Sequence, residues 1–262
     1  MLACAIAAAA FAVIAAAQQP SPTPQPQLLP PVQSEEDPTN PLLFSLRNEY
    51  RNLRNGAWAN TFLARFDKLW FRNLGNKHGA KGMVLRFDMP LNVVHIGGVT
   101  KAGLGDLYAQ AIYVPYIARN RKFAFSAGAG IVMPTATDRL LGQGKVILSP
   151  VVVPIWYLQK GKKMMLVRMQ NYVSIGGKRD RANVNYLLVD PVLALRLRRR
   201  TWLITNTEFK WDWRTHQASG ITGFQLGRIT KGKRAFWIKP EIPWGPGRQS
   251  DFIIKVGIHK FR

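Results

Sequence analysis

The chain has 262 residues, of which 47% are hydrophobic, and a formal net charge of +23 at pH 7. The hydrophobic content excludes a chain that is disordered over most of its length, and the single cysteine, Cys4, excludes a disulfide framework and a cysteine-based zinc site. A positive charge of this size indicates an anionic partner, either nucleic acid or a membrane surface.

The first 17 residues predict a secretory signal peptide. They are almost wholly apolar and end in Ala15, Ala16 and Ala17, small residues of the kind that precede a cleavage site. The segment is too short for a comfortable membrane span. Residues 18–41 are rich in proline, which prevents regular helix or sheet, so we expect a disordered linker. The folded domain is expected over residues 42–262.

The remainder of the chain predicts an all-β protein with about twelve strands. β-Branched and aromatic residues are common there, and helix formers are sparse. Many runs reach the roughly 9–11 residues that a strand needs to cross a bilayer. No helical segment separates them, so the sheet should be an antiparallel meander. The expected strands are 43–53, 58–70, 82–93, 103–118, 122–134, 145–159, 163–176, 183–198, 201–213, 218–230, 235–245 and 251–261.

The connections between these strands alternate between two kinds. One set is short and basic and defines what we call the short-turn rim: 118–122, 159–163, 198–200 and 231–234. The other set is longer and mixed and defines the long-loop rim: 94–103, 135–145, 176–183, 214–219 and 245–250. Short turns on one side and long loops on the other are typical of an antiparallel up-and-down transmembrane β-barrel of the outer membrane.

Charged residues recur on one face of several expected strands, opposite an apolar face. In the strand 82–93, Met83, Leu85 and Phe87 alternate with Arg86 and Asp88. A lipid-facing Arg or Lys near the midplane would cost roughly 2–4 kcal/mol, so the charged face should line the lumen. The lumen-lining candidates are Arg47, Glu49, Arg51, Arg65, Asp67, Arg86, Asp88, Arg168, Asp190, Arg196, Glu208, Lys210, Asp212, Lys239 and Glu241.

Aromatic residues cluster at both ends of the strands, as in the two aromatic girdles of a membrane barrel. Those near the short-turn rim are Trp70, Phe71, Phe123, Trp156, Tyr157, Trp202, Phe236, Trp237 and Phe261. Those near the long-loop rim are Trp58, Trp211, Trp213 and Trp244. The alternative is that they are ordinary core aromatics at strand ends.

The chain shows no constellation of residues that is typical of catalysis. HExxH, nucleophile-elbow and Walker A patterns are absent, and the four histidines lack the spacing of metal ligands. Glu208 and Asp212 share a strand face and could act as general acid and base, but Lys210 between them favours an ion-paired lumen wall. We therefore expect no enzymatic activity, no cofactor and no metal site.

Several short motifs occur in an order that resembles a family of bacterial outer-membrane β-barrels, the porin-like transporters of phenolic-degradation (MetA-type) pathways. The motif residues are Gly103, Gly105, Asp106, Pro134, Thr135, Asp138, Gly142, Gly144 and Lys145, followed by Gln170-Asn171, Asp180-Arg181, Asp190-Pro191 and Gly227-Arg228. The similarity runs from about residue 41 to residue 261. It implies an outer-membrane barrel with a transport or channel role. The chain departs from the family in its excess of Lys and Arg and in ending Phe261-Arg262 rather than on an aromatic residue or Phe-Pro.

These observations predict an outer-membrane channel for the passive uptake of a small solute, aromatic or anionic. The alternative is a structural outer-membrane barrel whose lumen is closed by ion pairs. The expected partners are membrane lipid and the solute rather than nucleic acid, because a signal peptide removes the chain from the cytoplasm. A basic ring at the periplasmic mouth should favour anions. Its members are Arg119, Arg121, Lys122, Lys160, Lys162, Lys163, Arg198, Arg199, Arg200, Lys231, Lys233 and Arg234.

Overall fold

The structure is a computed structural model that describes residues 44–72, 81–118, 122–159, 162–198, 200–230 and 234–260. The predicted signal peptide and linker lie outside these residues, as do Arg119, Arg121, Lys160, Arg199, Lys231 and Lys233 of the basic turns. The described residues contain no helix that is long and apolar enough to span a membrane.

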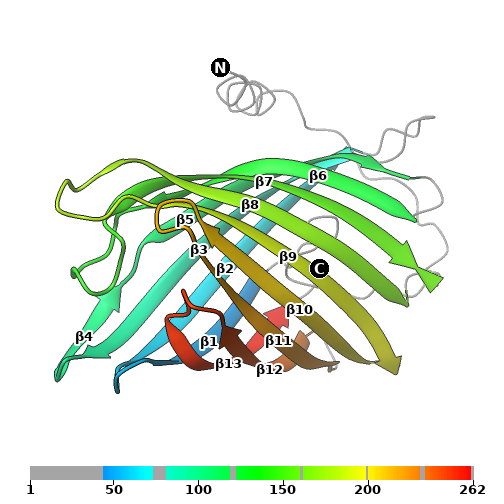
Figure 1. Cartoon of the computed structure of the whole chain (residues 1–262). Coiled ribbons are helices and arrows are strands. Elements are labelled where there is room, and N and C mark those ends of the chain that lie inside the picture. Colours follow the sequence, from blue (N-terminus) through cyan, green and yellow to red (C-terminus); the bar gives the residue numbers. More distant parts are fainter. Residues whose placement is uncertain are drawn as a thin grey trace.

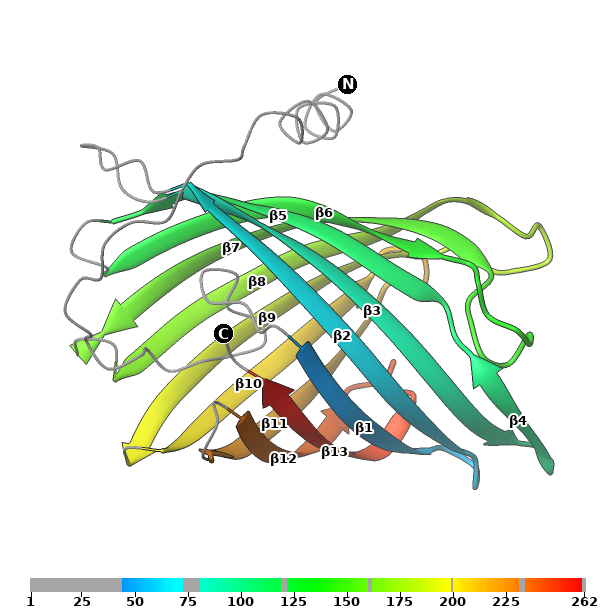
Figure 2. The ribbon, with the colours of Figure 1, turned by 180° about the vertical axis from the view of Figure 1, so that it is seen from behind.

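Within the described residues, thirteen β-strands form one antiparallel sheet that closes on itself (Figures 1 and 2). The strands are β1 (Phe44–Leu53), β2 (Trp58–Arg72), β3 (Lys81–Ile96), β4 (Val99–Leu104), β5 (Leu107–Ile117), β6 (Phe123–Met133), β7 (Lys145–Leu158), β8 (Lys163–Gly177), β9 (Asn185–Arg198), β10 (Thr201–Asp212), β11 (Gln217–Ile229), β12 (Arg234–Trp244) and β13 (Ser250–Lys260). Each strand pairs with its neighbour in the sequence, except that β5 pairs with β3 rather than with β4, and β1 pairs with β13.

Two of these strands share one position in the wall. The half of β3 toward the long-loop rim, residues 91–96, pairs with β4, and the half toward the short-turn rim, residues 82–88, pairs with β5. β4 and β5 are therefore one strand that is interrupted at Gly105 and Asp106. The barrel is closed by twelve strand positions among the described residues, which confirms the predicted fold class.

The prediction of the first long loop is wrong. Residues 94–103 were expected to form a loop, but β3 continues to Ile96 and β4 starts at Val99. The chain reverses at Gly97 and Gly98, whose φ angles are 57° and 77°. A two-residue turn with positive φ at both positions matches the twist of antiparallel strands and favours glycine. The Gly-Gly pair was thus a hairpin signal.

The barrel is apolar outside and charged inside along the strands that carry the predicted charges. On β3, Phe87, Met89 and Leu91 are exposed, whereas the alternating Arg86 and Asp88 are each only 7% exposed. Exposed large apolar side chains recur in the same way on the outer face of other strands, among them Phe62, Met169, Phe224, Ile238 and Val256. A water-soluble β-protein places its apolar face inside, so this arrangement is suited to surrounding lipid.

Part of the barrel interior is filled by an apolar cluster. It lies toward the short-turn rim, and its side chains are buried and come from eight strands. Its members are Val84, Ile112, Ala124, Val151, Val153, Ile155, Met164, Leu166, Val192, Ala194, Trp202, Ile204, Ala235 and Trp237. Ala124, Ile155, Met164, Leu166, Ala194 and Ala235 have no exposed surface, so water does not reach these six side chains.

This cluster contains aromatic residues that were predicted to form the girdle at the short-turn rim, so that part of the prediction is wrong. Trp202 and Trp237 are 5% and 6% exposed and lie inside the barrel, and Tyr157 packs against the same cluster. The inward position of Trp202 depends on Gly227 on the neighbouring strand, where a Cβ atom would collide with the indole. Phe123 and Trp156 do form an outer pair, with ring centroids 5.7 Å apart. The side chains of Trp70, Phe71 and Phe261 lie outside the described residues.

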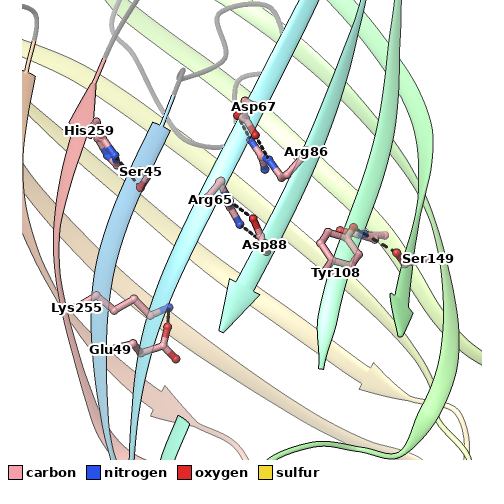
Figure 3. Close-up of polar contacts among 11 residues, drawn as sticks. Ser45, Glu49, Arg65, Asp67, Arg86, Asp88, Tyr108, Ser149, Lys255 and His259 are labelled. Atoms are coloured by element: carbon pink, nitrogen blue, oxygen red, sulfur yellow. Dashed lines mark hydrogen bonds and ion pairs between the residues drawn. The ribbon is translucent and has the colours of Figure 1, made fainter. Parts of the chain in front are cut away.

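The barrel closes where β1 meets β13. The two strands pair from Phe44↔Lys260 to Leu53↔Ser250. Two inward side-chain contacts cross the same seam (Figure 3). Ser45 Oγ lies 3.1 Å from His259 Nδ1, and Lys255 Nζ lies 3.3 Å from Glu49 Oε2. Polar side chains therefore reinforce the backbone pairing of the first and last strands.

Replacing Lys255 by methionine is expected to destabilise the barrel. Lys255 also lies 2.9 Å from Glu241, so the variant leaves two covered carboxylates without their shared cation. Breaking a buried pair from one side costs about 3–5 kcal/mol. Urea unfolding in detergent, followed by tryptophan fluorescence, measures the change. Lys260→Met, at an exposed position of the same strand, is the control and should shift the free energy of unfolding by less than about 0.5 kcal/mol. Equal stability of the two variants would contradict this role of Lys255.

Candidate functional site

A cavity of about 340 Å³ lies inside the barrel and is lined by polar and charged side chains. All fifteen of the predicted lumen-lining residues are described, and eleven of them lie on the wall of this cavity. These eleven are Arg47, Glu49, Arg51, Arg65, Arg86, Asp88, Arg168, Asp190, Glu208, Lys239 and Glu241. The structure thus brings most of the candidates together in one space.

The other four candidates are not on the cavity wall. Asp67 is 4% exposed, and its carboxylate is covered where it pairs with Arg86. Arg196 lies in the part of β9 nearer the short-turn rim. Lys210 lies over a tyrosine ring, nearer the long-loop rim. Asp212 ends β10, and its carboxylate accepts hydrogen bonds from two backbone amides of the following turn. The predicted general acid–base pair is therefore divided, because only Glu208 reaches the cavity.

Three neighbouring strands, β1, β13 and β12, present cations to the cavity. Glu49 forms ion pairs with Arg51 and with Lys255, and Glu241 lies 2.7 Å from Lys239 and 2.9 Å from Lys255. The two carboxylate side chains are only 5% and 3% exposed, whereas Arg51 is 43% exposed and the two lysines about 15%. We call Arg51, Lys239 and Lys255 the cationic wall. The acids lie beneath it, so the accessible charge there is positive.

The strands β2 and β3 carry two ion pairs that compensate each other locally (Figure 3). Arg65 donates to both oxygens of Asp88 at 2.7 and 2.6 Å. Arg86 donates to both oxygens of Asp67 at 2.9 and 3.0 Å. Such two-point contacts are strong and directional. The four side chains of these ion pairs are at most 9% exposed, so this part of the wall presents little uncompensated charge to the cavity.

The strands β8 to β10 present a more acidic surface. Arg168 lies 3.2 Å from Asp190 and 3.5 Å from Glu208. Asn206 donates through Nδ2 to Asp190 Oδ1 at 2.8 Å. The Glu208 side chain is 30% exposed, whereas the other ion-paired acids on the cavity wall are at most 9% exposed. Among the described residues, no group of three or more His, Cys, Asp and Glu side chains is arranged to hold a metal ion.

Several uncharged residues of the wall escaped the prediction from sequence. Gln170 donates to Tyr108 Oη at 2.9 Å, and that hydroxyl lies 3.3 Å from Ser149 Oγ. Tyr172, which lines the cavity, stacks on Tyr186 with ring centroids 4.7 Å apart. The signal for Gln170 was its position two residues after Arg168. Lys255 was also missed, although Ile253 and Lys255 share the inward face of β13.

The motif residues between Gly103 and Lys145 gather at the long-loop rim. Gly103 lies in β4, Gly105 and Asp106 form the interruption before β5, and Lys145 begins β7. The others, Pro134, Thr135, Asp138, Gly142 and Gly144, belong to the loop 134–144 between β6 and β7. This loop folds back onto the interruption between β4 and β5, so residues distant in the sequence form one unit.

Asp106 holds this loop in place. Its carboxylate accepts hydrogen bonds from the backbone amides of Ala136 at 3.1 Å and Gln143 at 2.5 Å. Asn92, on the inner face of β3, donates to the carbonyl of Leu141 at 2.8 Å, and Leu141 is 4% exposed. Asp106 also lines the cavity, so the residue that holds the loop belongs to the cavity wall as well.

The fold is a closed antiparallel β-barrel with twelve strand positions among the described residues, and solved porins and outer-membrane channels have the same fold. The structure is similar to the NanC porin, with a TM-score of 0.59 and 12% sequence identity over 84% of this chain and 99% of that one. It is also similar to the COG4313 outer membrane channel from Pseudomonas putida F1, with a TM-score of 0.66 and 8% identity over 84% of this chain and 94% of that one. For the KdgM porin the TM-score is 0.54, with 7% identity over 83% and 99%.

No family model and no curated protein matches the chain. At such low identities the likeness establishes the fold alone. Membership of the phenolic-degradation family therefore stays a hypothesis based on the motif residues.

Removal of the Asp106 carboxylate is expected to release the loop 134–144. In Asp106→Ala the two loop amides lose their charged acceptor, so the open form becomes about tenfold or more populated. Trypsin cleavage after Arg139, whose side chain is 70% exposed, reports this population. Asp251→Ala, at an exposed acid outside this loop, is the control. Identical cleavage rates in the two variants would show that Asp106 does not hold the loop.

Proposed function

We propose that the protein is an outer-membrane channel through which a small solute enters passively. The observation that carries the proposal is the charged cavity within a barrel whose outer face is apolar. Porins and channels of the same fold support a channel role, and one of them, a KdgM porin, was solved with disordered oligogalacturonate. Residues 1–17 would direct export, and residues 18–41 would link the signal to the barrel.

Both kinds of solute that the sequence predicted have potential partners on the cavity wall. The cationic wall would attract an anion, and Tyr172, stacked on Tyr186, offers an aromatic surface. The basic ring is a weaker reason for anion preference than expected. Two of its described members, Lys163 and Arg234, alternate with inward-facing residues of the apolar cluster and share the outer face of their strands with Met165 and Phe236.

A structural barrel with a closed lumen is the second candidate function. The observation that favours it is the apolar cluster, which fills the interior toward the short-turn rim. Closure would then come from apolar packing rather than from the ion pairs themselves. A solute that entered the cavity would cross only if this cluster opened.

Conductance across a planar bilayer decides between these two functions. The unmodified protein is expected to conduct, and Met164→Gly with Leu166→Gly should raise conductance several-fold because both side chains are buried in the cluster. Met165→Gly, on the outer face, is the control. Reversal potentials in dilute salt should show anion preference that fades near molar salt, where the Debye length is about 3 Å. Conduction by the double variant alone would favour the structural barrel. No conductance in either the unmodified protein or the double variant would refute a channel.

We further propose that the short-turn rim contacts anionic lipid headgroups. Three described basic side chains near this rim lie on outer strand faces, next to exposed apolar ones. Arg228 lies two residues after Leu226 on the same strand face, Arg234 lies two residues before Phe236, and Lys260 lies two residues after Ile258. Basic residues beside an apolar membrane-facing surface attract acidic headgroups.

Replacing Arg228, Arg234 and Lys260 by glutamine is expected to lower the retention of phosphatidylglycerol. Each cation near an anionic surface contributes about 1 kcal/mol, and phosphatidylcholine should be unaffected. Native mass spectrometry of the detergent-solubilised protein counts the bound lipids. The matched control replaces Arg139, Arg214 and Arg248, which are exposed in the long-loop connections. Equal losses in both triple variants would argue against a lipid site at the short-turn rim.

A further inference from the structure

The first element of a binding site is the accessibility of the cationic wall. Arg51, Lys239 and Lys255 neutralise Glu49 and Glu241, yet the acids are almost fully covered and the cations reach the cavity. A group that enters the cavity on this side meets three nitrogen-based donors. A carboxylate accepts several such hydrogen bonds and is the natural ligand for them.

The second element is a pair of hydrogen-bond acceptors on β10 that are not fully satisfied. Asn206 Oδ1 is buried and has no hydrogen-bond partner among the described residues. Two residues along the same face, Glu208 is 30% exposed, and its contact with Arg168, at 3.5 Å, is long for a hydrogen bond. A buried acceptor without a donor is unfavourable, so both groups would gain from a ligand that donates hydrogen bonds.

The third element is the glycine that brings these two surfaces together. Gly223 on β11 lies between β10 and β12. A Cβ atom at this position would lie 2.7 Å from Lys239 Cε and 3.1 Å from Asn206 Oδ1. A cation of the wall and an acceptor of β10 thus flank the same residue. Lys239 Cε and Asn206 Oδ1 are therefore close to each other, which suits a small molecule whose two charged groups are attached to the same carbon.

We infer that the cavity binds a small zwitterion, with its carboxylate against the cationic wall and its ammonium against Asn206 and Glu208. An ammonium has three donors and a positive charge, so it satisfies a neutral and an anionic acceptor together, whereas a hydroxyl has one donor. The inference deepens the proposed function by naming the class of solute that the cavity takes. It requires only that the cavity be reached from solution.

Saturation-transfer NMR on the full chain in nonionic detergent tests the inference with three probes of similar size. L-Alanine carries both charges, L-lactate replaces the ammonium by a hydroxyl, and isopropylamine lacks the carboxylate. Alanine is expected to bind at least about tenfold more tightly than either of the others, because each probe that lacks a charged group leaves one charged partner unsatisfied. Equal binding of lactate and alanine would overturn the inference, and so would the absence of alanine binding.

Two variants locate the binding within the cavity. Glu208→Gln should remove the preference for alanine over lactate and leave lactate binding intact. Lys239→Met should weaken alanine and lactate alike by about tenfold and leave isopropylamine unchanged. The matched controls are Asp212→Asn and Lys210→Met, an acid and a lysine on β10 that do not line the cavity. A heat-dependent shift in gel mobility shows that each variant is folded.

The outcomes separate this inference from the channel itself. Alanine binding that is weakened in both cavity variants and kept in both controls supports the zwitterion site, whether or not the protein conducts. Alanine binding that survives unchanged in both cavity variants places the ligand elsewhere and overturns the inference. Conduction without alanine binding leaves the proposed function in place and refutes only the zwitterion site.

Discussion

The backbone pairing of β1 with β13 is the interaction on which the rest of the barrel depends. Water is absent from the core of a bilayer, so an open edge of this sheet would expose a row of unpaired amides and carbonyls, each at a cost of several kcal/mol. The seam joins residues near the two ends of the described chain, from Phe44↔Lys260 to Leu53↔Ser250. Only when this contact forms does the sheet have an inside, and only then do the charged faces of the strands have a common place to meet.

Closure also explains why the interior charges are arranged as pairs. Strand neighbours along the seam bring Glu49, Lys255 and Glu241 within reach of one another, and the pairing of β2 with β3 does the same for two arginine–aspartate pairs. An isolated charge in this position would have to be neutralised or hydrated. The paired arrangement allows many ionisable groups in a narrow space and still leaves selected cations facing the cavity.

The alternation of apolar and polar residues was sufficient to predict the strands, the closed fold and most of the charged residues on the cavity wall. It worked because an up-and-down barrel imposes a period of two on every strand. The same parity placed Trp202 inside with Ile204 and Asn206, but a preference for aromatics at membrane interfaces suggested otherwise. The partners in each ion pair could not be predicted, since they depend on register between strands. The contact of Asp106 with the loop 134–144 spans some thirty residues and leaves no local periodicity.

The polar cavity ends at a buried apolar cluster, and this arrangement affects how a solute would cross the barrel. A pore of fixed width passes solutes at a rate set by diffusion in water, with weak dependence on temperature. Here the water column would end at Val192, Ile204 and Trp237, which belong both to the cavity wall and to the apolar cluster. Each crossing event would wait for a packed group of side chains to separate and repack. Permeation would then resemble the turnover of a slow enzyme, with a large activation enthalpy and a flux that saturates.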